Sequence, residues 1–175
     1  MLNKKTLFNG VYAVALFSAI STCFGIFNEL LNIMQLYGKE IVNLLNNSYK
    51  NEDFFIPFFY FLLTFIVCAA TVVILILSLT NKLDEKYARL PNVSIIASCA
   101  VTFILACTFI YLIQRYSAFA DYYFIRSFDY TTLYTFRSLV MSYIASVGTI
   151  LLCNIIQSKT ENKVIANPAD EETQE

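Results

Sequence analysis

The chain has 175 residues, of which 58% are hydrophobic and only 14% are charged, and its formal net charge is −1. A soluble domain carries about a quarter charged residues, so this composition indicates a protein dissolved in lipid. Histidine is absent from the sequence, which removes the commonest acid–base catalyst and transition-metal ligand at neutral pH. The near-neutral charge without a basic stripe argues against a nucleic-acid partner.

Four charge-free apolar runs follow one another along the chain. A helix rises about 1.5 Å per residue, so about 20 residues cross the roughly 30 Å hydrocarbon core of a bilayer. Each run is continuously apolar rather than alternating, which favours helices over barrel strands. The predicted spans cover residues 6–28, 54–81, 90–114 and 133–158, the last with its charge-free part at 138–158.

The first run has two alternative interpretations. Lys4 and Lys5 before an apolar stretch also describe a cleaved signal peptide, and the residues around Cys23 resemble a bacterial lipobox. We prefer an uncleaved span, because the apolar pattern continues past Cys23. Apolar residues then recur at helical spacing up to Leu44, so the helix either extends beyond the bilayer or breaks at Gly38 into a short interfacial helix.

The second and third spans are joined by a short polar turn at residues 82–89. The second span is bulky almost all round, so we expect it to be the most lipid-exposed helix. The third and fourth spans instead carry small residues at helical spacing, which let backbones approach and hydroxyls bond across helices. We expect these two spans to pack against each other, chiefly through Ser98, Thr102, Ser142 and Ser146. A hydroxyl-lined conduit between them is the alternative. The predicted packing residues are Ser94, Ser98, Thr102, Ala106, Ser138, Ser142 and Ser146.

The segment 115–137 is rich in tyrosine, phenylalanine, arginine and aspartate. Tyrosine is common at membrane interfaces, so we predict that the outer loops, 29–53 and 115–132, form a small aromatic-rich extracytoplasmic cap. The candidate interaction residues at this outer rim are Glu29, Arg115, Arg126 and Arg137. We expect Arg137 to pair with Glu29. The alternatives are that Arg137 reaches lipid phosphate alone, or that Arg126 helps to bind an anionic ligand.

The sequence offers no catalytic, cofactor or metal site. All five cysteines fall within spans and behave as small hydrophobes, and the four glycines form no phosphate-binding loop. The tail, residues 159–175, is polar and acidic and is predicted to be disordered, with peptide docking as the alternative.

Together these observations predict an all-α integral membrane protein, a four-helix bundle spanning 1–158 with both termini cytoplasmic. The orientation follows from seven lysines and arginines in the amino end, middle loop and tail, against five in the other two loops. We expect a non-catalytic multi-pass protein of the cell membrane that works through contacts with lipid and with a membrane-protein partner or further copies of itself. A small oligomeric transporter or channel is the alternative.

The threading is tested by cysteines introduced singly at Asn47 and Lys163. An impermeant thiol reagent should modify the first from outside and the second only from inside, because an odd number of spans separates them. Modification of both positions from the same side would contradict this topology.

Overall fold

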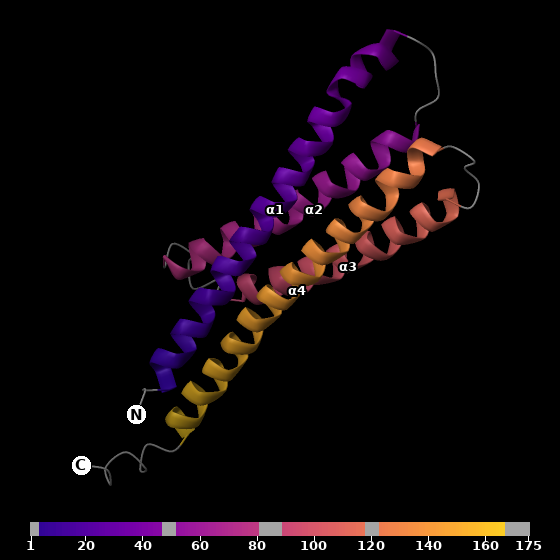
Figure 1. The fold of residues 1–175 in the computed structure, drawn as a ribbon. Coiled ribbons are helices and arrows are strands. Elements are labelled where there is room, and N and C mark those ends of the chain that lie inside the picture. The colour runs from indigo at the N-terminus through magenta and orange to yellow at the C-terminus, as the bar shows by residue number, and fades with distance from the viewer. Residues whose placement is uncertain (1–3, 47–51, 81–88, 118–122, 167–175) are drawn as a thin grey trace.

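The computed structural model describes residues 4–46, 52–80, 89–117 and 123–166, with side chains for 8–35, 58–80, 89–112, 114 and 133–158. All four elements in these ranges are helices: α1 (Lys4–Asn46), α2 (Glu52–Leu79), α3 (Leu90–Ser117) and α4 (Tyr123–Ala166) (Figure 1). Each contains a stretch long and apolar enough to cross a membrane. The prediction of an all-helical protein with four candidate spans is therefore confirmed. These spans are Phe8–Gln35, Phe58–Leu79, Leu90–Leu112 and Leu133–Ser158.

The helices run alternately up and down (Figure 1), and their contacts form a ring. Each helix packs against its neighbour in the chain, α1 closes the ring against α4, and α2 meets α4 across the centre. The start of α1 and the end of α4 lie at the same end of the bundle (Figure 1). This is the arrangement that four antiparallel helices joined by short connections must adopt.

The first and last helices, α1 and α4, are much longer than the hydrocarbon core of a bilayer is thick. α1 has 43 residues and α4 has 44, about 65 Å each, against a hydrocarbon core of roughly 30 Å. α1 continues through Gly38, so the helix does not break there. α4 includes residues 123–132 and 159–166, which the sequence pattern had assigned to a loop and a tail. Pro168 follows shortly after its last residue, Ala166, and disfavours helix at the residue before it.

A cluster of rings fills one half of the bundle core. Phe136 of α4 lies with its ring centroid 4.8 Å from that of Phe61 on α2 and 4.8 Å from that of Phe109 on α3. All three side chains are buried. Edge-to-face packing of this kind fixes the mutual orientation of the three helices. On the neighbouring flank, Phe27 of α1 stacks at 5.3 Å on Phe65 of α2.

The expectation that α2 is the most lipid-exposed span is wrong. The buried share of its most apolar window is 28%, the same as for α1 and α3, against 33% for α4. The large size of the α2 side chains does not show which of them face lipid and which face the core. α2 buries a regular stripe of Phe61, Thr64, Cys68, Val72 and Leu75, whose spacing of three and four places it on one face of the helix.

α1 and α4 approach closely at Gly25. A Cβ atom built at this glycine would lie 2.8 Å from Cδ2 of Leu139. Rotation of Leu139 would relieve a single methyl group, but a larger side chain has no room. Glycine here therefore sets the helix separation, as small residues commonly do where membrane helices cross.

We expect Gly25→Leu to destabilise the protein by about 1–3 kcal/mol through overpacking. The matched control is Gly148→Leu on α4, because a Cβ there meets nothing within 4 Å. Both changes remove a helical glycine, so their difference isolates the packing term. Unfolding in mixed micelles measures it, and equal effects would show that Gly25 does not set the α1–α4 distance.

Candidate functional site

The centre of the bundle holds a buried tyrosine, Tyr143 of α4. Its side chain has 0% exposure, and its hydroxyl donates a 3.2 Å hydrogen bond to Oγ of Ser98 on α3. The Thr71 and Cys68 side chains of α2 lie beside the phenol, whose one hydrogen bond within the described residues is the bond to Ser98. One phenol thus connects three helices at mid-membrane depth.

The fourth helix joins this cluster through sulfur. Cys23 of α1 lies beside Cys68, and both thiols are free and buried. We call Cys23, Cys68, Thr71, Ser98 and Tyr143 the central cluster. It contains at least one side chain from every helix, so all four helices meet at one level, and the hydrogen bond from Tyr143 to Ser98 joins α4 to α3 there.

The hydroxyls of the central cluster also bond to their own helices. Ser98 donates to the carbonyl of Ile95 at 3.0 Å, and Thr71 donates to that of Val67 at 3.0 Å. Such local bonds let a hydroxyl sit inside a membrane helix without an unsatisfied donor. Within the described part of the chain, every buried side-chain nitrogen and oxygen has a partner. The cluster therefore has the character of a structural tie between helices.

A second line of hydroxyl contacts runs along the α1–α4 interface. The oxygens of Ser18 and Ser146 are 2.8 Å apart, and those of Thr22 and Ser142 are 3.4 Å apart. The structure thus separates residues that the sequence pattern had grouped at the α3–α4 interface: Ser142 and Ser146 contact α1 instead. Ser98 does face α4, where it meets Tyr143.

The other predicted packing residues occupy different environments. Thr102 and Ala106 are buried in the core, and the Thr102 hydroxyl donates to the carbonyl of Ser98 at 2.7 Å. Ser94 donates to the carbonyl of Pro91 at 2.8 Å and is half-buried. Ser138 is exposed on α4. Of the three predicted packing serines of α4, Ser146 is buried against α1, Ser142 contacts α1 from an exposed position, and Ser138 is exposed.

At the outer rim, Glu29 is half-buried and Arg137 is exposed. The contacts Ser18–Ser146, Thr22–Ser142 and Gly25–Leu139 step along both helices in register. The next step of four residues places Glu29 opposite Thr135. Arg137 lies on the outward face with Tyr134, which is 75% exposed.

The structure therefore does not bring Glu29 and Arg137 together, and no ion pair joins them within the described residues. Helix rotation is the physical reason: Arg137 follows Thr135 by two positions, so it points away from the α1 side. Arg115 and Arg126, and with them most of the predicted aromatic cap, lie outside the residues whose side chains are described.

Two side-chain hydrogen bonds between helices were not predicted from the sequence. Asn92 of α3 accepts a 2.8 Å hydrogen bond from the amide of Asn154 on α4, near the end of the bundle that carries the termini. Asn154 is a polar residue inside an apolar run, which is the signal that could have indicated an interhelical bond. Tyr143 is the same kind of signal, since a buried phenol needs a partner.

We expect Tyr143→Phe to destabilise the protein by about 1 kcal/mol, the usual size of an interhelical hydrogen bond in a membrane. The ring is retained, so no cavity contributes. The exposed Tyr134 gives a matched control, and Tyr134→Phe should change the free energy of unfolding hardly at all. Equal effects would mean that the hydroxyl of Tyr143 does not tie the helices.

Comparisons with models of protein families, with characterised proteins and with solved structures give no match for this chain. The chain's own residues are therefore the guide to what it does.

Proposed function

We propose that the chain is a non-catalytic multi-pass protein of the cell membrane, an accessory subunit or membrane-organising factor that works through its lateral surface. One observation carries the proposal: the polar side chains inside the bundle already have hydrogen-bond partners, in one another or in the backbone of their own helix. Every buried side-chain nitrogen and oxygen of the described residues has a hydrogen-bond partner. A binding or catalytic centre needs polar groups that are free to meet a substrate.

The packing of the core supports the same reading. Phe61, Phe109, Phe136 and Tyr143 have at most 1% exposure and fill the space between the helices. A conducting path through one copy would need this space to be open and lined by polar groups. The groups left for function are therefore those on the outside of the bundle.

The outward face of α4 offers one such surface. Tyr134 is 75% exposed and Met141 is 57% exposed, and Arg137 is exposed between them. An aromatic ring, an arginine and a methionine are the residue types enriched where proteins bind one another. Their position near the outer end of α4 places the guanidinium close to the headgroup level, where a partner's anion is accessible.

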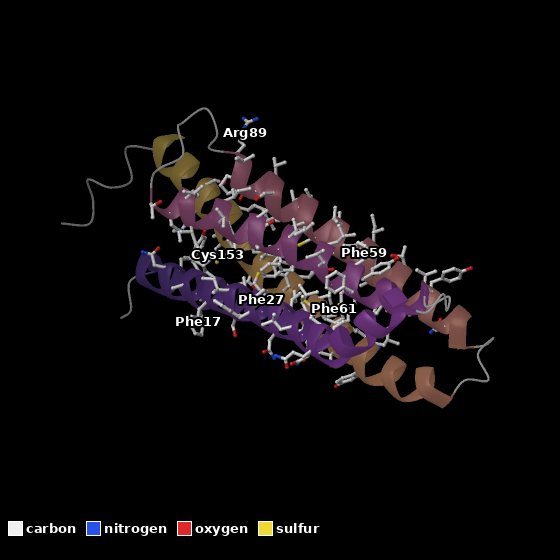
Figure 2. All side chains as sticks on the ribbon, turned by 90° about the horizontal axis from the view of Figure 1, so that it is seen from above. Phe17, Phe27, Phe59, Phe61, Arg89 and Cys153 are labelled. Atoms are coloured by element: carbon white, nitrogen blue, oxygen red, sulfur yellow. The ribbon has the colours of Figure 1, made fainter. Side chains whose placement is uncertain are left out.

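Affinity purification from native membranes in a mild detergent should recover a foreign membrane protein in stoichiometric amount. Arg137→Ala should lower its recovery by about fivefold or more, as expected for an arginine at an interface. The exposed Arg89, at the opposite end of the bundle (Figure 2), is the control and should be replaceable by alanine without loss. Recovery of no foreign partner, or ion conduction by the purified chain in planar bilayers, would contradict the proposal.

A further inference from the structure

The outer rim of the bundle carries one acid and one base that do not meet. Among the residues whose side chains are described, Glu29 is the sole acid, and Arg137 and Arg89 are the sole bases. Arg89 lies at the opposite end of the bundle (Figure 2). Neither Glu29 nor Arg137 forms an ion pair within these residues. Two opposite charges at one rim are thus available for a contact outside the chain.

Glu29 and Arg137 lie at nearly the same level of the bundle. The register of α1 against α4 places Glu29 opposite Thr135. Arg137 is two residues further along α4, so it lies about 3 Å from that level. A second copy inserted with the same topology holds both charges at the same depth. An ion pair between two copies therefore requires no shift of one copy along the membrane normal.

The two charges lie on opposite flanks of the outward face of α4. Successive residues of a helix are turned by about 100°, so Arg137 is turned by about 200° from Thr135, which faces α1. Phe136 comes between them in the sequence and is buried in the core, so the outward face occupies the other half of the helix. Going round α4 from the α1 side, the order is therefore Glu29, the outward face and Arg137. The members of this face, exposed or half-buried, are Tyr134, Ser138, Met141, Ala145, Gly148 and Leu152.

The shape of the outward face of α4 allows it to pack against a copy of itself. Its members recur in steps of four and three, the spacing of the a and d positions of a heptad repeat. Tyr134 is 75% exposed, Leu152 is 61% exposed and Met141 is 57% exposed. Gly148 leaves open space beside it, since a Cβ there meets nothing within 4 Å. The face has no charged member between its two flanks, so like charges do not meet where two such faces pack.

We propose that the outward face of α4 binds the same face of a second copy of this chain, and that Arg137 of each copy pairs with Glu29 of the other. The dimer is parallel, and its two-fold axis is normal to the membrane and passes between the two α4 helices. A half-turn about this axis places the Arg137 flank of one copy against the Glu29 flank of the other, so the ion pair occurs twice. Charge complementarity at one level therefore identifies the chain itself as the occupant of this face.

This inference rests on the proposed function, because it takes the outward face of α4 as a binding surface and names the anion that Arg137 meets. A foreign partner then binds the dimer, and Arg137→Ala releases that partner by separating the two copies. The experiments below follow copies of this chain alone. They can fail while a foreign partner is still recovered, and they can succeed where none is recovered.

The first experiment exchanges charges between two differently tagged copies of the full chain, expressed in one membrane and solubilised in a mild detergent. Glu29→Arg and Arg137→Glu should each lower the recovery of one tagged copy with the other by about tenfold or more, since like charges then meet in both pairs. A Glu29→Arg copy mixed with an Arg137→Glu copy should restore recovery, because each pair across the axis is again an arginine with a glutamate. Arg89→Glu, at the opposite end of the bundle, is the control and should have no effect.

Recovery of the mixed pair that is no higher than that of each variant alone would overturn the proposal. Arg137 would then be assigned to a lipid phosphate or to the anion of a foreign protein. Thermal unfolding shows whether each variant is folded. Where a charge reversal unfolds the chain, Glu29→Gln and Arg137→Gln take its place, and each should lower recovery by about fivefold. Unchanged recovery with both neutral variants would equally contradict the pairing.

A crosslink examines the face without changing a charge. Benzoylphenylalanine replaces Tyr134 or, as the matched control, Phe103 of α3, which is 57% exposed. In native membranes Tyr134→benzoylphenylalanine should give a product of twice the 20.0 kDa chain mass, and Phe103→benzoylphenylalanine should not. Equal yields from the two positions, or a product that contains a different protein, would rule out the α4 dimer.

Discussion

A bundle in hydrocarbon cannot rely on the hydrophobic effect to hold its helices together, because a leucine gains little by leaving lipid for another helix. The association then depends on contacts that lipid cannot make. In this protein the phenol of Tyr143 is central, since it donates a hydrogen bond to Ser98 on α3 and lies beside Cys68 and Thr71 on α2. The ring stacking of Phe61, Phe109 and Phe136 and the line of hydroxyls between α1 and α4 are arranged around that level.

The two kinds of helix contact serve different purposes. Between α2, α3 and α4 the core is filled by large rings, which hold orientation by shape. Between α1 and α4 the contacts are serine, threonine and glycine, which allow close approach, with one short hydrogen bond between Ser18 and Ser146 and a longer contact between Thr22 and Ser142. α1 and α4 are also the two longest helices, with 43 and 44 residues. Close packing between them therefore aligns the parts of the chain that extend beyond the bilayer.

The four spans could be predicted because lipid imposes a simple requirement on every residue of a crossing helix, and a run of apolar residues meets it visibly. The pairing of helices could not be predicted in the same way. A stripe such as Ser142 and Ser146 shows that a neighbour comes close, but not which one, and both serines contact α1 rather than α3.

The limits of the helices were harder to predict for a related reason. Outside the bilayer the apolar signal ends, although the backbone remains helical, as at residues 159–166 of α4. The rotation of each helix about its own axis could not be predicted either. Two positions separate Thr135, on the α1 side, from Arg137, on the outward side, and spacing from the end of a span does not fix that angle.

The same reasoning connects the interior of the bundle to its surface. A polar side chain in hydrocarbon is tolerated when it is bonded, and the hydroxyls of the central cluster are bonded to neighbours or to their own backbone. Ser21 and Asn28 belong to the same span as Ser18 and Thr22, yet they lie on the opposite flank of α1, away from those bonds. The rotation of α1 about its axis thus decides which of its polar side chains bond inside the bundle, because residues three to four apart share a face and those between them do not.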